Sequence, residues 1–333
     1  MEVKILTKRQ NFLETIRGGK PDRFVNQYEF MPFIPGNPIS GAYPLTVKGG
    51  PPVKSTWGVW RYWPENVPAG YPLHDKEHVV IKDITRWKEY VEIPKTDYPD
   101  SAWEKAVAAA EAVDRKEVFA AIAFGGGVFE QCHHTMGMAE ALSNFYEEPE
   151  HMHDFIKCVT DYELRYAEQV CKHLKIDLLF HHDDWGTQKS LFMSPEMFQE
   201  FIKPSYMQIY KYYKEHGVEI IIHHADCYAA TLVPDMIDMG VDVYQGCMST
   251  NNVPELVKKY GGKISFMGDL DNGILDKEDW TQELVRKEVE RACRKNGKHY
   301  FIPCLVQGGP SSLYPGVYQA VSEEINKMSK EMF

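Results

Sequence analysis

The chain has 333 residues, of which 44% are hydrophobic, 13% aromatic and 26% charged, and this ordinary globular composition excludes a chain that is disordered throughout. Its formal net charge is −11 and no run of four Lys or Arg residues occurs, which argues against nucleic-acid binding through phosphate neutralisation. The length fits either two average domains or one α/β barrel.

The first hundred residues are irregular and aromatic. We predict a helix over 8–17 and a short strand over 24–30. Between 32 and 72, Pro and Gly are too frequent for one regular element, and the many aromatic residues argue against disorder. This stretch is therefore predicted to form long ordered loops that make a lid or a pocket wall.

From about residue 100, apolar strand-like runs alternate with helical stretches. The predicted strands are 118–124, 178–182, 218–224, 241–245, 264–267 and 299–304, and the predicted helices are 102–113, 135–173, 195–216, 229–239, 253–260, 279–296 and 315–331. Ser194 before Pro195 indicates one helix start, His216-Gly217 the end of that helix, and Glu278 with Asp279 a second start. Nearly continuous apolar strands are typical of a parallel sheet that is buried on both faces.

The even spacing of these units favours a closed barrel over an open sheet. We predict an α/β fold, a (β/α)8 TIM barrel with an irregular, aromatic N-terminal extension. The whole chain, 1–333, is interpreted as one domain, in which 1–100 form the N-terminal loops and pocket wall and 101–333 form the barrel.

Targeting signals and the number of cysteines indicate where in the cell the protein is expected. No apolar stretch reaches membrane-spanning length, and the N-terminal residues lack the apolar centre of a signal peptide, so we expect a cytoplasmic protein with no membrane contact. Seven scattered cysteines do not form a secreted disulfide framework, which leaves thiols free to bind metal.

Five consecutive predicted strands end in His, Asp or Cys, and strand ends converge on one face of a barrel. The candidate metal ligands there are His224, Asp226, Cys247 and Cys304. This mixture of imidazole, carboxylate and thiolate suits Zn²⁺, although a catalytic zinc needs only three protein ligands. Of the pair His223-His224, only one can face the interior, and His224 is preferred because it shares its face with Asp226.

The segment HHDDWG (181–186) offers two adjacent carboxylates, Asp183 and Asp184, as catalytic candidates. At most one can point into a pocket, where it would act as a general acid or base or accept a hydrogen bond from substrate. The alternative is a helix cap or a salt-bridged strand end. Gly125–Gly127 lack the spacing of a phosphate-binding loop and are interpreted as a tight turn after a strand.

Several motifs together resemble those of the uroporphyrinogen decarboxylase superfamily. They are STWGVW (55–60), the long run 178–227, KISFMGDLD (263–271) and HYFIPC (299–304). The chain is more similar to the cobalamin-dependent methyltransferase branch than to the decarboxylase, because RFVNQYEFMPFIPG (23–36) stands in place of the decarboxylase's arginine-rich segment. The zinc site of that branch has the form His-x-Cys followed by a distant Cys. His224 and Cys304 match, whereas Asp226 replaces the middle thiolate, so the third ligand is either Asp226 or Cys247.

The resemblance implies a zinc-dependent transfer of a methyl group from a methoxylated substrate to the Co(I) cobamide of a partner corrinoid protein. The aromatic N-terminal half favours an aromatic substrate, and the expected substrate-binding residues are Tyr28, Glu29, Trp57, Trp185 and His182. The alternatives are methyl transfer from methylcobamide to a thiol, a decarboxylase, or a binding barrel without activity. The oligomeric state stays open, with a homodimer as one option.

Overall fold

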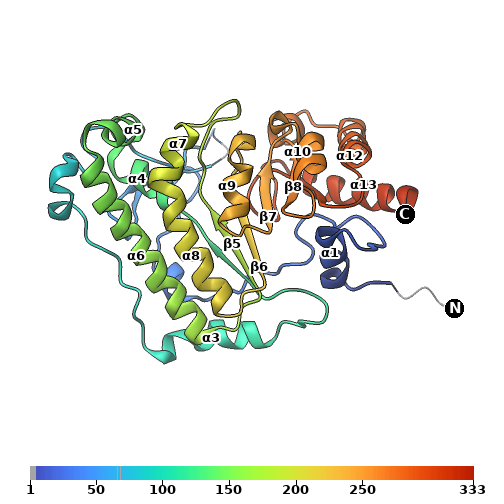
Figure 1. The fold of residues 1–333 in the computed structure, drawn as a ribbon, viewed down its shortest axis with the longest axis horizontal. Coiled ribbons are helices and arrows are strands. Elements are labelled where there is room, and N and C mark those ends of the chain that lie inside the picture. Colours follow the sequence, from blue (N-terminus) through green and yellow to red (C-terminus); the bar gives the residue numbers. More distant parts are fainter. Residues whose placement is uncertain (1–4, 66, 68) are drawn as a thin grey trace.

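The computed structural model describes residues 5–65, 67 and 69–333 and centres on a six-stranded parallel sheet whose strands follow one another in chain order (Figure 1). The strands of this sheet are β4 (Ala121–Phe124), β5 (Leu178–His182), β6 (Ile220–His224), β7 (Val243–Cys247), β8 (Ser265–Leu270) and β9 (Phe301–Leu305). The helices are α1 (Lys8–Arg17), α2 (Pro38–Gly41), α3 (Asp100–Glu111), α4 (Val128–Met136), α5 (Met138–Glu147), α6 (Pro149–His173), α7 (Pro195–Met197), α8 (Lys203–Glu215), α9 (Val233–Asp238), α10 (Val253–Tyr260), α11 (Asn272–Leu275), α12 (Gln282–Asn296) and α13 (Val317–Met332).

An irregular N-terminal segment, residues 24–34, lies between the two edge strands of this sheet. Phe33 forms a parallel bridge with Ala121 of β4, and the Ile34 amide donates to the Ala121 carbonyl at 2.8 Å. On the other side, the Leu305 amide of β9 donates to the side chain of Gln27. The α/β class with a parallel sheet is therefore confirmed. The described residues contain six parallel strands rather than the expected eight, and the segment 24–34 occupies the remaining gap.

Side chains of the sheet alternate between two hydrophobic clusters. The inner one, enclosed by the strands and the segment 24–34, includes Phe180, Ile222 and Cys304. The larger outer one lies between the strands and the helices and takes the alternate positions, for example Leu179 and Ile221. This alternation decides which residues at the strand ends share a space.

The expected helix 135–173 is wrong as one element, because the chain forms α4, α5 and α6 there. Gly137 separates α4 from α5 with a φ of +88°, in the left-handed region that favours glycine. Pro149 begins α6, since the residue before a proline is disfavoured in helical conformation. Within the expected helix 195–216, a π-helical turn at Phe198–Ile202 precedes Pro204, which has no N–H for a regular helical bond.

One expected strand is absent, and of two expected helix starts one is displaced and one is confirmed. The strand expected over 24–30 is wrong, because these residues form turns and irregular backbone, in which the Phe30 carbonyl accepts from the Phe119 amide just before β4. The start expected near Asp279 is also displaced: Thr281 is the cap, and its side chain accepts from the Leu284 amide. Ser194 caps the helix at Pro195 as expected, by accepting from the Met197 amide at 3.2 Å.

The aromatic segment before residue 90 forms a wall that packs on α6. It contains the antiparallel strands β1 (Val53–Lys54), β2 (Trp60–Tyr62) and β3 (Tyr71–Pro72) and the 3₁₀ turn Ile84–Glu89. Trp57 meets Tyr162 of α6 edge to face, with 5.0 Å between the ring centroids, and the Asn37 amide donates to Tyr166 at 2.7 Å. These contacts give the irregular segment a fixed position over the end of the sheet.

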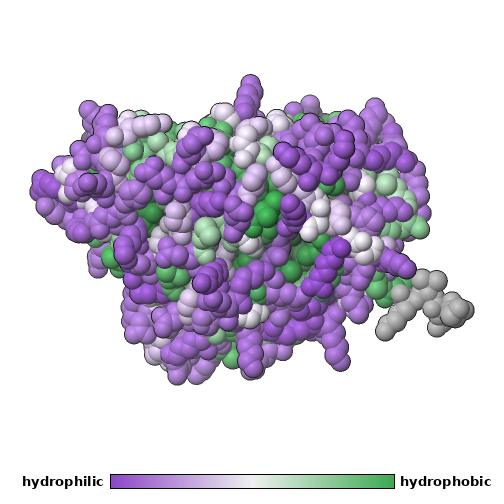
Figure 2. Space-filling view, in the orientation of Figure 1, coloured by the Kyte–Doolittle hydropathy of each residue, from purple (hydrophilic) through white to green (hydrophobic). Residues whose placement is uncertain are grey.

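The surface in the orientation of Figure 1 is largely hydrophilic, and hydrophobic residues show in small patches on it (Figure 2). No helix among the described residues combines the length and apolarity needed to cross a bilayer.

Candidate active site

A cavity of about 390 Å³ lies between the N-terminal wall and the ends of β4 and β5, which is the size of a small-molecule site. Trp57 and Arg61 line it from the wall. Glu130 and His134 of α4 line it together with His182, the last residue of β5. The cavity therefore has an aromatic side and a polar side.

Three neighbouring strands place a polar group beside this cavity. The sheet register pairs His182 with His224 and His224 with Gln245, so the three inward-facing side chains lie next to one another. His182 Nε2 is 3.2 Å from an Asp184 carboxylate oxygen. Nitrogen and oxygen atoms of His182, Asp184 and His224 all lie within 4.8 Å of one another. We refer to these three residues as the strand-end group.

Carboxylates crowd around His182. Burial by itself would lower the pKa of His182, but Glu130 and Asp184 raise it to about 10. Burial and the Asp184 charge raise the pKa of Asp226 to about 7, and burial raises the pKa of Glu130 to about 8. Burial would raise the pKa of Asp184 too, yet the adjacent His182 lowers it below its ordinary value. The negative charges of Asp184 and the partly ionised Asp226 thus outweigh the single positive charge of His182.

Gln245 fixes the orientation of the His224 ring. Its side-chain nitrogen donates to the carbonyls of Leu305 and Val306, both at 3.3 Å, so its oxygen must face His224. That oxygen accepts the proton of His224 Nδ1, which leaves Nε2 with a free lone pair. Burial lowers the pKa of His224 to about 4, so the imidazole is neutral at pH 7.

Asp183 is fully buried and ties β5 to α4. Its carboxylate accepts from the Phe129 and Glu130 amides, at 3.0 and 2.7 Å, and from Trp185 Nε1 at 2.9 Å. The Tyr206 hydroxyl also donates to it. The structure therefore makes Asp183 a cap for a helix N-terminus, whereas Asp184 contacts His182, which lines the cavity.

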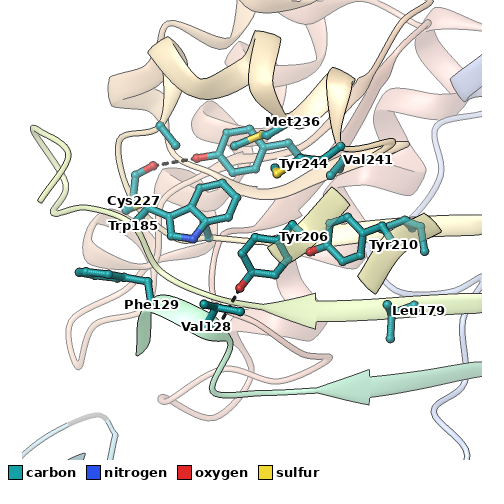
Figure 3. Packing of buried hydrophobic residues seen from close by; sticks show 14 of the residues in the cluster. Val128, Phe129, Leu179, Trp185, Tyr206, Tyr210, Cys227, Met236, Val241 and Tyr244 are labelled. Atoms are coloured by element: carbon teal, nitrogen blue, oxygen red, sulfur yellow. Dashed lines mark hydrogen bonds between the residues drawn. The ribbon is translucent and has the colours of Figure 1, made fainter. Parts of the chain in front are cut away.

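Trp185 lies away from the cavity. Its ring is fully buried in the outer cluster, stacks on His223 with 4.0 Å between centroids, and packs beside Tyr206 next to Val128, the first residue of α4 (Figure 3). The expected contact of Trp185 with substrate is thus not formed in this arrangement.

The turn before α4 leaves no room for a side chain at Gly127. A Cβ there would lie 2.4 Å from the Tyr206 hydroxyl and 2.7 Å from Asp183 Cβ, whereas one at Gly125 would meet nothing within 4 Å. Gly127→Ala should therefore lower the free energy of unfolding by about 1–3 kcal/mol, as overpacking does. Gly125→Ala is the matched control, and urea unfolding of both variants measures the difference. Equal stability of the two would contradict this packing.

The other expected site residues divide into two sets. Trp57 and His182 line the cavity. Tyr28 is buried in the inner cluster, where its hydroxyl donates to the Gln307 carbonyl. Glu29 accepts from the Asn26 amide and has Arg23, Lys8 and Glu117 as charged neighbours, so it faces away from the cavity.

The two cysteine candidates face opposite sides of the sheet. Cys304 is fully buried in the inner cluster, and burial raises the pKa of its thiol. Cys247 packs in the outer cluster with Asp269 as a charged neighbour, because the ladder is irregular at Gly246, whose φ is +82°. The structure does not bring Cys247 together with His224.

Sequence reasoning missed Glu130, Gln245 and Arg61. Glu130 lies on a helix rather than at a strand end, so the strand-end rule did not reach it. Gln245 holds the position two residues before Cys247, and strict alternation would have placed both on one face. Arg61 was hidden in the irregular aromatic segment, where no periodicity marks the inward side.

Comparison with known proteins identifies the family. A methyltransferase from Methanosarcina mazei has a similar structure, with a TM-score of 0.64 and 13% sequence identity over 97% of this chain and 99% of that chain. This similarity extends to the fold alone. A search of curated proteins gives no match. The sequence model of the family described as uroporphyrinogen decarboxylase (URO-D) matches residues 67–323. The chain belongs to the uroporphyrinogen decarboxylase family.

In this family member, the strand-end group has the donor atoms that a divalent metal ion needs. His224 supplies a neutral imidazole, His182 supplies one once the metal displaces its proton, and Asp184 supplies a carboxylate. Asp184 and the partly ionised Asp226 supply the negative charge that a cation needs, whereas Glu130 is protonated at pH 7. Imidazole with carboxylate suits zinc among the common divalent ions, so the residues fit a metal of this kind.

His223 makes the stability of this uroporphyrinogen decarboxylase family member sensitive to acid. Burial lowers its pKa well below the ordinary value, so it is neutral in the folded protein, whereas the unfolded chain takes up a proton near pH 6.5. The unfolded state then binds more protons, and stability falls as the pH decreases below about 6.5, by up to about 1.4 kcal/mol per unit.

Replacing His223 by Phe should flatten this slope, although it lowers stability at pH 7.5 by removing the hydrogen bond to Tyr210. Urea unfolding at pH 7.5 and 5.5 compares the slopes. Exposed His216→Phe should leave the slope of the parent protein unchanged. A slope that is identical in all three proteins would contradict the prediction.

Proposed function

We propose that this chain transfers a methyl group from a methoxylated aromatic compound to the Co(I) cobamide of a corrinoid protein, with a zinc ion at the strand-end group. The observation that carries the proposal is the position of His182, which belongs both to that group and to the lining of the cavity with the aromatic wall. Family membership and the fold shared with a methyltransferase support the same reaction class.

In this proposal His224 is the first zinc ligand, because its free Nε2 is already oriented by Gln245. His182 and Asp184 are the nearest further donors, and the backbone amide of Asp226 donates to the Asp184 carboxylate at 2.9 Å. Cys304 is the thiol on the same side of the sheet. A zinc ion bound there would supply Lewis acidity at the oxygen that carries the methyl group.

The remaining residues bind the substrate and supply a proton. Removal of the methyl group as an electrophile leaves a phenolate, which must be protonated before release. Burial raises the pKa of Glu130 to about 8, so while no cation is bound to it this cavity-lining carboxyl holds a proton at pH 7 and can donate it to the phenolate. Trp57 and Tyr162 supply aromatic surface for the ring of the substrate.

A decarboxylase acting on a polycarboxylic acid is the second candidate, because the family carries that name. Such a substrate calls for several cationic side chains. Among the described residues that line the cavity, Arg61 is the only Arg or Lys. This lining favours a substrate of low charge and therefore the methyl transfer.

The experiment combines the purified protein, Zn²⁺, a corrinoid protein reduced to Co(I), and a panel of methoxylated benzenes and benzoates. Loss of the Co(I) absorbance together with release of the matching phenol is the expected result. Methylcobamide with a thiol tests the reverse direction, and carbon dioxide release from the same acids tests the decarboxylase. Carbon dioxide release without any methyl transfer to cobalt would overturn the proposal.

A further inference from the structure

One turn of helix α4 carries a second cluster of metal-binding side chains. Glu130, His133 and His134 occupy positions i, i+3 and i+4, which share one face of a helix. One donor atom from each lies within 4.8 Å of the other two. The strand-end group contains none of these residues, so the cluster is separate from the zinc ligands proposed above.

The ring nitrogens of these two histidines are available to bind a cation. His133 Nδ1 is buried without a hydrogen-bond partner among the described residues, which is costly unless a ligand satisfies it. His134 is 9% exposed, and its Nε2 is 3.9 Å from Glu130 Oε1, beyond hydrogen-bonding distance. Burial lowers the pKa of His133 to about 3 and lowers that of His134, so both rings keep free lone pairs at pH 7.

We infer that Glu130, His133 and His134 form a second binding site for a divalent transition-metal ion such as Zn²⁺. Two imidazoles and the carboxylate that Glu130 offers once the ion displaces its proton match the ligand set of open zinc sites, in which a further position is left to water or substrate. Donor atoms around a tetrahedral zinc lie roughly 3.4 Å apart, so small side-chain rotations complete the geometry.

Glu130 places this site next to the strand-end group. The same oxygen, Oε1, lies 3.9 Å from His134 Nε2 and 3.7 Å from His182 Nε2. Glu130 and His134 also line the cavity, so an ion held there would face the bound substrate. An opposing charge comes from Arg61, whose guanidinium is one of the groups that lower the pKa of His134. The site is therefore predicted to bind its ion less tightly than the strand-end group.

Zinc binding to metal-free full-length protein tests the site by equilibrium dialysis and elemental analysis. We expect about two zinc ions per chain for the parent protein, and about one for His224→Ala and for His133→Gln/His134→Gln. The double variant His151→Gln/His153→Gln changes neighbouring histidines on α6 and should keep about two. Because the two sites lose zinc in different variants, failure of one does not imply failure of the other.

A second measurement needs no variant of the cluster. In His224→Ala labelled with ¹⁵N in its histidine rings, zinc should shift the ring signals of His133 and His134 while His151 and His153 keep theirs. Arg61→Gln should tighten this binding, since it removes the opposing charge. The inference is overturned if saturating zinc leaves the ring signals of His133 and His134 unchanged, or if His133→Gln/His134→Gln binds as much zinc as the parent protein.

Discussion

His224→Ala should abolish the proposed metal binding at the strand-end group and reduce kcat/KM for the proposed methyl transfer by well over 100-fold. His224 is buried at the end of β6, and Gln245 already directs its free nitrogen. Loss of a residue that only orients a ligand costs about 10- to 100-fold in metal affinity or activity, and loss of the ligand itself removes a bond to the metal. Metal content and single-turnover methylation of cobalt measure the two effects.

Gln245→Ala provides the graded comparison. It removes the partner of His224 Nδ1 but keeps the imidazole, so we expect the metal to bind with affinity lowered by about 10- to 100-fold. His216→Ala, an exposed substitution, should behave as the parent protein. If His224→Ala keeps its metal and its rate, then the strand-end group does not hold the catalytic ion.

Regular elements were predictable from sequence where local signals agree with packing. The helix 8–17, the strand 178–182 and the helix 253–260 were predicted with the bounds that the structure has. The two helices carry apolar residues at helical spacing, and the strand begins with a short continuous apolar run. The long helix 135–173 failed because one glycine and one proline interrupt a pattern that is otherwise continuous.

The candidate site was predictable only in part. Strand alternation correctly placed His224 rather than His223 on the inner face. Cys247 was chosen because it lies at a strand end, but a local irregularity at Gly246 turns it outward. Glu130 belongs to a helix whose position depends on a hydrogen-bonded carboxylate from another strand, and such long-range contacts leave no local signal in the sequence.

Asp183→Asn should destabilise the fold by about 3–5 kcal/mol, the range observed when one partner of a buried charged network is lost. Both oxygens of Asp183 accept hydrogen bonds, from the Phe129 and Glu130 amides on α4 and from the side chains of Trp185 and Tyr206. An amide group has one acceptor oxygen, so its NH₂ would face a donor and leave it unsatisfied.

The same substitution should loosen the start of α4, because its amides lose their cap. Urea unfolding gives the free energy, and hydrogen exchange at Phe129 and Glu130 reports on the helix start. Tyr206→Phe removes one donor to Asp183 and the acceptor for the Val128 amide, so a smaller loss of about 1–3 kcal/mol is expected.

A double variant tests whether Asp183 and Tyr206 contribute to stability jointly or independently. Since Asp183 and Tyr206 share one hydrogen bond, Asp183→Asn/Tyr206→Phe should cost less than the sum of the two single changes. A strictly additive cost, or a loss below about 1 kcal/mol for Asp183→Asn, would contradict the capping role. In that case Asp183 would again be a candidate for catalysis, because a buried carboxylate that contributes little to stability needs another reason to be ionised there.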